Sequence, residues 1–349
     1  MNILVTGGAG YIGSHTCVAL LEAGYRVVVL DNLSNSCAES LSRVRAITGK
    51  ELVFEKTDLC DEAALTDCFS KYKFEGVIHF AGLKSVSESL QLPLQYYHNN
   101  LLSTLNLCRA MARFRVAKLI FSSSATVYGV PEMMPVNENC ATSATNPYGR
   151  SKLMIEEMLA DWVNASLASF EKGEADICPE VVLLRYFNPV GAHESGLIGE
   201  NPLGIPNNLV PYMVQVAAGK HGKLNIYGND YPTRDGTGVR DYIHVCDLAQ
   251  GHLAALQWLV DRKAKGPLID VFNLGTGRGC SVLELLDCFE TVSGVKVPCQ
   301  IVGRREGDVA ECYADIQKAR DILGWVAEKS INEMMVDTWR WQKNNPEGY

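Results

Sequence analysis

The glycine-rich segment near the start of the chain restricts its fold more than any other feature. Gly7, Gly10 and Gly13 follow a short β-branched run at residues 3–6 and precede an amphipathic stretch at 14–23. Without side chains, such a turn lets backbone amides and a helix N-terminus approach a pyrophosphate. The order of strand, glycine turn and helix therefore predicts a dinucleotide-binding sheet, with these three glycines at the cofactor.

Short aliphatic runs alternate with longer amphipathic stretches along much of the chain. This alternation predicts an α/β protein built on a Rossmann-type doubly wound parallel sheet. A smaller, loop-rich α/β lobe is expected to bind the substrate. The predicted strands are residues 3–6, 26–30, 52–55, 76–81, 118–123, 181–187 and 271–274.

The pattern changes near residue 188, where Gly and Pro begin to concentrate in the sequence. We expect residues 1–188 to form the cofactor-binding domain and residues 189–349 to form most of the substrate lobe. Because segments near 239–275 are expected to return to the first domain, the two would be interleaved. The polar stretch 166–179 is expected to be a surface connection.

Composition excludes several classes of protein. The 349 residues include 32 Lys and Arg against 40 Asp and Glu, a net charge of −8, which disfavours binding to nucleic acids or anionic membranes. The apolar runs are shorter than the roughly 20 residues of a membrane-spanning helix, and no basic leader is evident, so we expect a cytoplasmic protein. Twelve cysteines lack metal-ligand spacing, which predicts reduced thiols and no metal site.

Asp31 closes the second predicted strand, downstream of the glycine turn. A carboxylate there can accept hydrogen bonds from the adenosine ribose hydroxyls and would repel a 2′-phosphate. The sequence therefore favours NAD over NADP as the cofactor.

Further candidates lie at the ends of other predicted strands, where a parallel sheet admits its ligand. Asp58 and Leu59 follow the third strand and could hold the adenine, although an ordinary polar strand end explains Asp58 equally well. Lys84 could reach the cofactor ribose or be a solvated loop lysine. The residues that close the fourth strand and are predicted to bind the cofactor are Phe80, Ala81, Gly82 and Lys84.

Chemistry is predicted where the fifth strand ends and a later helix begins. Ser122 and Ser124 end the strand, and Tyr148 and Lys152, four residues apart, share one face of a helix. A phenol with a pKa near ~10 is a poor base, but an ammonium and a cationic cofactor ring stabilise the phenolate.

Tyr148 is therefore the predicted proton carrier for a substrate hydroxyl. Lys152 would lower its pKa and hold the nicotinamide ribose, and Ser124 would hydrogen-bond the reacting oxygen or relay its proton. An ordinary helix pair is the alternative reading of Tyr148 and Lys152. Their combination with the glycine turn and Asp31 favours a hydride-transfer enzyme.

The chain resembles the extended short-chain dehydrogenase/reductase superfamily and, within it, the UDP-galactose 4-epimerase family, over nearly its whole length. The resemblance depends on long strings rather than single residues. These strings are residues 7–14, 80–84, 122–129, 146–152, 185–189, 228–230, 235–244 and 305–308.

The resemblance implies a nucleotide-sugar lobe and a fuller set of contacts. NAD would be bound by Tyr11, Ile12, Asp31, Asn32, Ser36, Asp58, Leu59, Phe80, Lys84, Asn99, Tyr148, Lys152 and Phe187. The UDP-hexose substrate would be bound by Lys84, Ser124, Tyr148, Phe187, Asn188, Asn208, Leu209, Asn225, Ile226, Tyr227, Arg240, Arg305, Asp308 and Cys312. Physically, Arg240 and Arg305 can neutralise a diphosphate, although either one alone would more often be a surface charge.

The reaction implied by the resemblance oxidises C4 of the hexose, lets the 4-ketose turn over, and reduces it from the opposite face. Cys312 stands where the members restricted to plain hexoses have a bulky tyrosine, so N-acetylated UDP-hexoses are expected as further substrates. One more buried thiol is the alternative reading of Cys312. The resemblance also implies a homodimer formed through helices at 93–113 and 148–162.

Two other functions remain open on the sequence. A nucleotide-sugar 4,6-dehydratase needs an acid and a base beside the catalytic hydroxyl, but Ala125, Thr126 and Val127 follow Ser124. A non-catalytic dinucleotide sensor would not need Tyr148 and Lys152.

Overall fold

The structure is a computed structural model that describes residues 1–173, 177–264, 266–305 and 307–349. The chain forms two compact units. Unit 1 comprises Met1–Gly129, Thr142–Arg185 and Ala249–Phe272, and unit 2 comprises Val130–Ala141, Tyr186–Leu248 and Asn273–Tyr349. Residues 130–141, 186–188, 239–248 and 273–275, expected in the first domain, thus cluster with unit 2.

Unit 1 is built on a seven-stranded sheet with the strand order β10-β6-β5-β4-β1-β2-β3. β1 pairs in parallel with β2 and β4, as do β2 with β3 and β4 with β5. Each of the seven predicted strands is one strand of this sheet, and the run near residue 271 returns to its edge beside β6, as expected. The predicted doubly wound parallel fold is confirmed.

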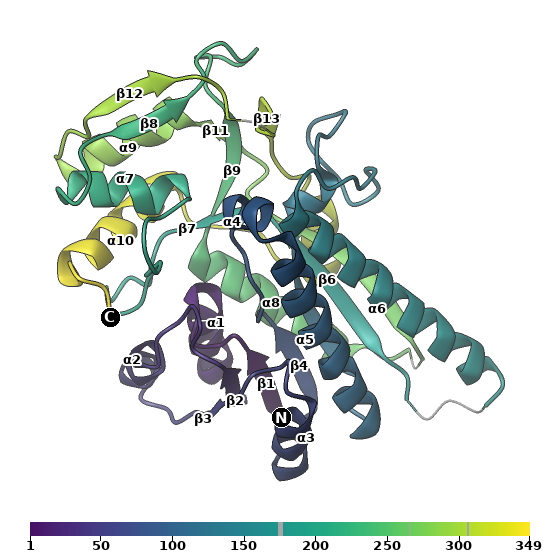
Figure 1. The fold of residues 1–349 in the computed structure, drawn as a ribbon. Coiled ribbons are helices and arrows are strands. Elements are labelled where there is room, and N and C mark those ends of the chain that lie inside the picture. The colour runs from purple at the N-terminus through teal and green to yellow at the C-terminus, as the bar shows by residue number, and fades with distance from the viewer. Residues whose placement is uncertain (174–176, 265, 306) are drawn as a thin grey trace. The chain divides into compact units, whose positions relative to one another are not determined.

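Figure 1 shows this sheet and the helices that follow its strands, with most of these elements labelled. Their bounds are β1 (Asn2–Thr6), α1 (Tyr11–Glu22), β2 (Arg26–Asp31), α2 (Glu39–Thr48), β3 (Val53–Lys56), α3 (Glu62–Lys71), β4 (Gly76–His79), α4 (Val86–Gln91), α5 (Pro93–Arg113), β5 (Lys118–Ser124), the 3₁₀ helix η1 (Ala125–Tyr128), α6 (Pro147–Glu171), β6 (Glu180–Tyr186), α8 (Val245–Asp261) and β10 (Leu268–Leu274).

The core of unit 1 follows the period-two alternation of its strands. Leu4 and Val28 point to the face covered by α3, α5 and α6, where they meet buried side chains such as Phe69 and Leu159. The helices α5 and α6 pack side by side on this face (Figure 1). Burying both faces makes the strands continuously apolar, as parallel sheets require.

The helix α6 extends further than expected. It begins at Pro147, with the Asn146 side chain accepting a hydrogen bond from the Gly149 amide at 2.9 Å, and it continues to Glu171. The expected surface connection is therefore wrong for residues 166–171, which are helical. Polar composition misled the prediction, since this end of the helix is largely solvated. Residues 174–176 lie outside the described part of the chain.

Unit 2 has a small sheet in which β9 pairs in parallel with β7 and β13 and antiparallel with β11, and a separate parallel pair, β8 and β12. Its hydrophobic core includes Met213, Ile226 and Phe289. The elements are β7 (Asn188–Val190), α7 (Leu209–Ala217), β8 (Leu224–Tyr227), β9 (Val239–His244), β11 (Gly279–Ser281), α9 (Val282–Ser293), β12 (Cys299–Val302), β13 (Glu311–Cys312), the π-helical turn η2 (Ala319–Leu323) and α10 (Ile331–Asn344).

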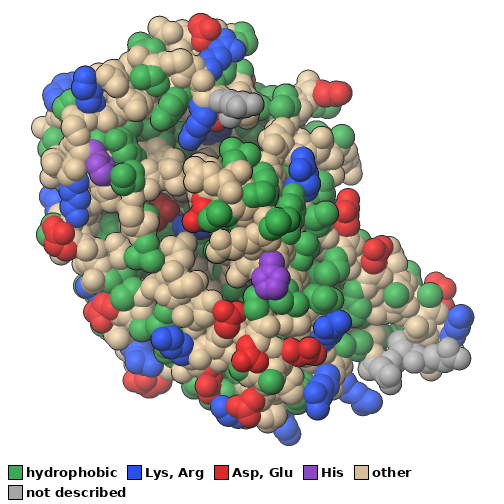
Figure 2. All heavy atoms as spheres, in the orientation of Figure 1, with side chains coloured by type: hydrophobic (Ala, Val, Ile, Leu, Met, Phe, Trp, Pro, Cys, Tyr) green, Lys and Arg blue, Asp and Glu red, His purple; other side chains and the backbone are tan. Residues whose placement is uncertain are grey.

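The surface mixes charges of both signs. Lys and Arg side chains lie among Asp and Glu side chains on the face drawn in Figure 2. Among the described residues, no helix is long and apolar enough to cross a membrane. All twelve cysteines are free thiols.

Candidate active site

The glycine turn is packed so closely that side chains would not fit. Gly7 has φ +69°, and a Cβ there would lie 2.7 Å from the backbone nitrogen of Ala81. A Cβ on Gly13 would lie 2.3 Å from the Gly7 carbonyl oxygen. The helix α1 starts from Gly10 with no side-chain cap, so the helix end is open to an anionic group. This turn fits the pyrophosphate of a dinucleotide.

Asp31 is buried at the end of β2 and organises the loop around it. Its Oδ2 accepts from the Ala9 amide at 3.0 Å, and its Oδ1 accepts from the Leu33 amide at 2.9 Å and from Ser36 Oγ at 2.8 Å. A carboxylate has about four acceptor positions, so capacity remains for a ribose hydroxyl. Ser36, predicted to bind the cofactor, thus lies directly against Asp31.

Asn32 and Asp58 are brought together by the adjacent ends of β2 and β3. Asn32 Nδ2 donates to Asp58 Oδ2 at 3.0 Å. Partial burial acts to raise the pKa of Asp58, but hydrogen bonds from Asn32 and Cys60 outweigh it, so the pKa of Asp58 is lowered. Leu59 lies in the hydrophobic core and Asn106 Nδ2 donates to its carbonyl oxygen at 3.0 Å. Its predicted cofactor contact would therefore fall to its backbone.

The segment after β4 is clamped by Asn100, a residue that the sequence analysis missed. Asn100 Oδ1 accepts from the Leu83 amide at 2.8 Å, and its Nδ2 donates to the Leu83 carbonyl at 3.1 Å and to Ser151 Oγ on α6 at 3.0 Å. The predicted residue Asn99 donates to the same Oδ1 at 3.0 Å. A Cβ on Gly82, which has φ +155°, would come within 3.1 Å of this oxygen.

The remaining predicted cofactor residues of unit 1 lie along the same sheet edge. Tyr11 and Ile12 form the first turn of α1. The Phe80 ring lies 4.7 Å from the His252 ring, between centroids. Lys84 follows in the clamped segment after β4 and is exposed.

A buried relay of hydroxyls and an imidazole supports this edge. His79 Nδ1 lies 2.6 Å from Thr6 Oγ1, and its Nε2 lies 3.0 Å from Thr104 Oγ1, which donates to the Asn100 carbonyl at 2.8 Å. Burial, together with the charge of Lys152, lowers the pKa of His79 to about 3. The ring is therefore neutral and structural at physiological pH. Thr6 and His79 end neighbouring strands, which is the sequence signal that could have indicated them.

Tyr148 and Ser124 form the predicted proton-transfer pair. Ser124 Oγ accepts from the Thr126 amide at 3.2 Å and from Thr126 Oγ1 at 3.0 Å. With both lone pairs engaged, its own proton is left to donate. Burial raises the pKa of Tyr148, and the hydrogen bond with Ser124 opposes that rise. The lowering of this pKa by Lys152 and a cationic cofactor stays a prediction.

Lys152 is buried one helical turn after Tyr148. Its Nζ donates to the Ser122 carbonyl at 2.7 Å and lies 4.8 Å from the centroid of the Phe121 ring. Burial lowers the pKa of Lys152 to about 8, and Glu156 opposes this shift. The structure thus brings Ser122, Ser124, Tyr148 and Lys152 together within unit 1.

Unit 2 holds a cluster of the predicted substrate residues. Asp308 accepts from Arg305 Nε at 3.3 Å and lies 3.7 Å from Arg240 Nη2, so one carboxylate is shared by two guanidinium groups. The Arg305 guanidinium lies 5.0 Å from the centroid of the Tyr227 ring. Cys312 on β13 pairs in register with Arg240 on β9, and burial raises the pKa of its thiol to about 11. Two cations against one anion leave this cluster suited to a diphosphate.

The other predicted substrate residues are spread over unit 2. Phe187 is buried and precedes the exposed Asn188 at the start of β7. Asn208 stands at the N-cap position of α7, which begins at Leu209, without a capping hydrogen bond from its side chain. Asn225 and Ile226 lie on β8, where Asn225 Oδ1 accepts from Gln300 at 2.8 Å. The Ile226 side chain belongs to the hydrophobic core, so only its backbone could touch a substrate.

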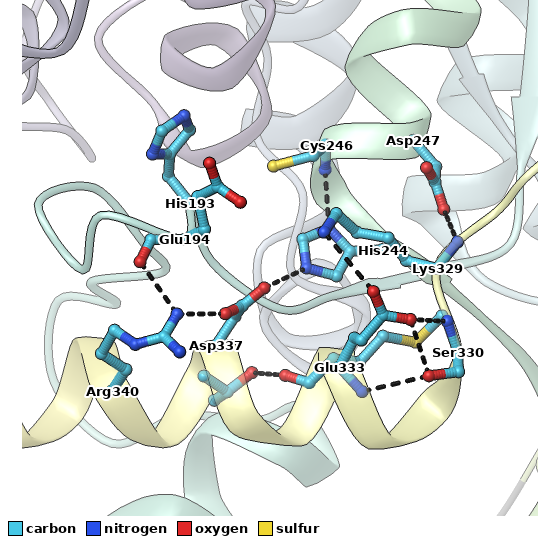
Figure 3. A network of polar contacts seen from close by, with 12 residues as sticks. His193, Glu194, His244, Cys246, Asp247, Lys329, Ser330, Glu333, Asp337 and Arg340 are labelled. Atoms are coloured by element: carbon cyan, nitrogen blue, oxygen red, sulfur yellow. Dashed lines mark hydrogen bonds and ion pairs between the residues drawn. The ribbon is translucent and has the colours of Figure 1, made fainter.

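A buried network around His244 was also missed. His244 Nε2 lies 3.2 Å from Asp337 Oδ2, and its Nδ1 accepts from the Cys246 amide at 3.0 Å. Figure 3 draws both contacts as dashed lines. Arg340 donates to Asp337 and to the Glu194 carbonyl. Both ring nitrogens of His244 are engaged, so the network ties α10 to β9 rather than offering a base. Residues this far apart in sequence leave no local spacing signal.

Comparison with known proteins agrees with this arrangement. Residues 4–338 match the family model described as GDP-mannose 4,6 dehydratase. The UDP-glucose 4-epimerase of Bacillus subtilis (strain 168) is 57% identical over 349 residues, covering 100% of this chain and 99% of that protein. The chain belongs to the UDP-glucose 4-epimerase family. This family lies within the extended short-chain dehydrogenase/reductase superfamily, as the sequence motifs indicated.

Solved structures of the epimerase family share the whole fold. The UDP-glucose 4-epimerase of Bifidobacterium longum, in complex with NAD⁺ and UDP, superposes with a TM-score of 0.93 at 48% identity and full coverage of both chains. The UDP-Glc/GlcNAc 4-epimerase of Campylobacter jejuni gives a TM-score of 0.82 at 38% identity, covering 98% of this chain and 99% of that one. The predicted fold and family are confirmed.

Proposed function

We propose that this chain interconverts UDP-glucose and UDP-galactose by oxidising and re-reducing C4 of the hexose, with NAD as cofactor. The observation that carries the proposal is the buried group of Ser124, Tyr148 and Lys152 at the strand edge that also bears the glycine turn and Asp31. The NAD⁺ and UDP of the Bifidobacterium longum complex support the same assignment.

Four residues of unit 1 have defined tasks in this reaction. NAD, when bound, would supply the hydride acceptor and donor for C4. Tyr148 takes the proton of the 4-hydroxyl group and later gives it back, Ser124 donates a hydrogen bond to the reacting oxygen, and Lys152 stabilises the phenolate. Asp31 binds the adenosine ribose through its remaining acceptor capacity.

Residues of unit 2 would bind the nucleotide. Arg240 and Arg305 would neutralise the diphosphate, and Asp308 would accept hydrogen bonds from ribose hydroxyl groups. Charge-assisted bonds to the diphosphate hold UDP, while the hexose keeps the freedom to present either face.

The surroundings of Ser124 argue against 4,6-dehydratase activity, the activity named in the description of the matching family model. Elimination of water needs a carboxylic acid and a base next to the catalytic hydroxyl. The following helix η1 contributes Ala125, Thr126, Val127 and Tyr128, none of which has a carboxyl group, and the Thr126 hydroxyl donates to Ser124. Reversible oxidation without elimination is the chemistry that these side chains can support.

We infer that N-acetylated UDP-hexoses are further substrates. Cys312 is a small residue on β13 beside Arg240, and a small side chain leaves volume for an acetamido group. The Campylobacter jejuni protein, a UDP-Glc/GlcNAc 4-epimerase, shows that relatives with this fold can include the acetamido sugar.

The protein is also expected to act as a homodimer through α5 and α6. Leu94 on α5 is 80% exposed and Met154 on α6 is 42% exposed. Apolar side chains that a second copy of the chain covers would be exposed in this way when one chain is considered alone. Light scattering should then give twice the chain mass of 38.3 kDa.

Proton NMR tests the proposed reaction directly. Purified protein is mixed with UDP-galactose, first without and then with added NAD, and the anomeric signals are followed. Appearance of UDP-glucose supports the proposal. The absence of conversion in both conditions contradicts it, and formation of a 4-keto-6-deoxy product would indicate the dehydratase.

The Cys312→Tyr variant tests the substrate range. We expect it to lower kcat/KM for UDP-N-acetylgalactosamine by about 10- to 100-fold while UDP-galactose turnover changes little, because the added ring fills the space for the acetamido group. Cys299→Tyr, at an exposed thiol of the same unit, is the matched control. Equal losses of kcat/KM for both sugars would contradict the proposal that the size of residue 312 sets the substrate range.

A further inference from the structure

Glu156 is a buried carboxylate that the proposed reaction does not use. It lies on α6, four residues after Lys152 and eight after Tyr148, so all three side chains share one helix face. Glu156 is 4% exposed, compared with 5% for Lys152 and 8% for Tyr148. A charge this deeply buried requires partners, and its partners identify what it organises.

The partners of Glu156 come from two neighbouring strands. Ser123 Oγ on β5 donates to Oε1, and Arg185 Nε at the end of β6 donates to Oε1 at 3.0 Å and to Oε2 at 3.2 Å. Arg185 Nη2 also donates to Oε2, and its guanidinium lies 4.9 Å from the centroid of the Tyr128 ring. The side chains of α6, β5 and β6 are therefore joined at one carboxylate.

Three consecutive serines of β5 hold three successive turns of α6. Ser124 is hydrogen-bonded to Tyr148, the Ser122 carbonyl accepts from Lys152, and Ser123 donates to Glu156. Because the contact of Glu156 lies between the other two along the strand, it fixes how far the helix can slide or rotate against β5. A small shift here would separate Tyr148 from Ser124.

Glu156 also sets the charge around Lys152. The titratable groups that face Lys152 are Tyr148 and Glu156 on α6 and the neutral His79 on β4, with Arg185 on β6 beyond Glu156. The Glu156–Arg185 pair is neutral as a whole. Without its carboxylate, the buried and permanently charged guanidinium would face Lys152 uncompensated.

We propose that Glu156 is a positioning residue for the proposed reaction, which holds the Tyr148–Lys152 face of α6 on β5 and neutralises Arg185. This role rests on the proposed function, because the reaction that Glu156 supports is the one proposed above. Glu156 acts through Tyr148 and Lys152 and needs no contact with substrate or cofactor.

A second buried ion pair of unit 1 provides the matched control. Glu180 is 9% exposed at the start of β6 and accepts from Lys118 at the start of β5 and from Arg262, both at 2.8 Å. It joins the same two strands at their opposite ends. A general loss of stability should therefore be similar in Glu180→Gln, whereas effects on the proton-transfer pair should be confined to Glu156.

The test compares Glu156→Gln, Glu156→Asp and Glu180→Gln by pH profiles of kcat in the cofactor-loaded protein. Glu156→Gln leaves Arg185 uncompensated, so both limbs of the profile should move to lower pH by about one unit. Its kcat should fall by about tenfold or more, with KM little changed. Glu156→Asp keeps the charge and should restore the wild-type profile, and Glu180→Gln should not move it. A profile that is unchanged in a folded Glu156→Gln protein overturns the proposal.

Two further measurements keep the proposal testable. If Glu156→Gln does not fold, Ser123→Ala keeps the ion pair but removes the strand contact, and kcat should fall by about 3- to 10-fold. An unchanged kcat in Ser123→Ala would then overturn the positioning role. Ultraviolet titration of tyrosinate, corrected with Tyr148→Phe, reads the Tyr148 pKa without any sugar. A shift to lower pH in Glu156→Gln supports the proposal even if the wild type converts no UDP-hexose, which would refute only the proposed function.

Discussion

The predicted site residues are held very differently in the two units. In unit 1, Ser124, Tyr148 and Lys152 are each less than a tenth exposed and lie on a strand or helix. In unit 2, Arg305 is 51% and Tyr227 is 40% exposed, and Arg305 follows the strand β12 in a loop. The first group is fixed by its surroundings and the second is held by a few polar contacts.

This difference follows the demands of the two tasks. Proton and hydride transfer need atoms fixed within fractions of an ångström, which only packed elements provide. A diphosphate can be held by flexible cations, since charge-assisted bonds tolerate variation in geometry. Substitutions in unit 1 should therefore lower kcat, and substitutions in unit 2 should mainly weaken binding.

The largest effect is expected for Tyr148→Phe. Phenylalanine keeps the packing but removes the proton carrier, so kcat should fall by about 10²- to 10⁴-fold while the Kd for UDP stays unchanged. Steady-state kinetics and calorimetry measure the two quantities. Tyr72→Phe, which removes a hydroxyl bonded to Glu55 at 2.7 Å in the same unit, is the control. Full turnover by Tyr148→Phe would contradict the proposed mechanism.

The same comparison explains what could be predicted from the sequence. The seven strands and the start of α6 followed from local patterns, because aliphatic runs and the Asn146–Pro147 cap are read over a few residues. The glycine turn and the pair Tyr148 and Lys152 also have short, fixed spacings. Local periodicity therefore predicted much of unit 1.

The supporting residues could not be predicted in this way. Asn100 meets Leu83 and Ser151, and His244 meets Asp337, across separations that only the fold determines. Buried polar pairs leave no periodic trace, because each partner looks like an ordinary polar residue in its own segment. Tertiary contacts also placed residues 130–141 with unit 2, where the Val136 amide donates to the Tyr313 carbonyl at 2.9 Å.

An intermediate effect is expected for Arg305→Met in unit 2. Losing one charge-assisted contact should raise the Kd for UDP by about 10- to 100-fold and leave kcat at saturating substrate within about threefold of wild type. Arg304→Met is the matched control, because the neighbouring arginine is bonded to Asp230 and stacks on Tyr231 instead. A large loss of kcat with unchanged UDP affinity would mean that the exposed cluster takes part in the chemistry.

The smallest effect on activity is expected for Asp337→Asn, which tests whether the rigid part of unit 2 is separate from its binding cluster. The free energy of unfolding should fall by about 1–3 kcal/mol, because His244 and Arg340 lose a buried carboxylate, whereas kcat and the Kd for UDP should change less than about twofold.

The pH dependence identifies the cause of that loss. Burial acts to raise the pKa of Asp337, but His244 and Arg340 together outweigh it and lower this pKa in the folded protein. The stabilisation is therefore complete above the ordinary carboxyl range and is lost as pH falls through the lowered pKa, below about 4. The difference in unfolding free energy between wild type and Asp337→Asn should shrink over that range, as denaturant titrations at several pH values would measure. A difference that stays constant to low pH would show that the carboxylate charge is not what holds α10 to β9.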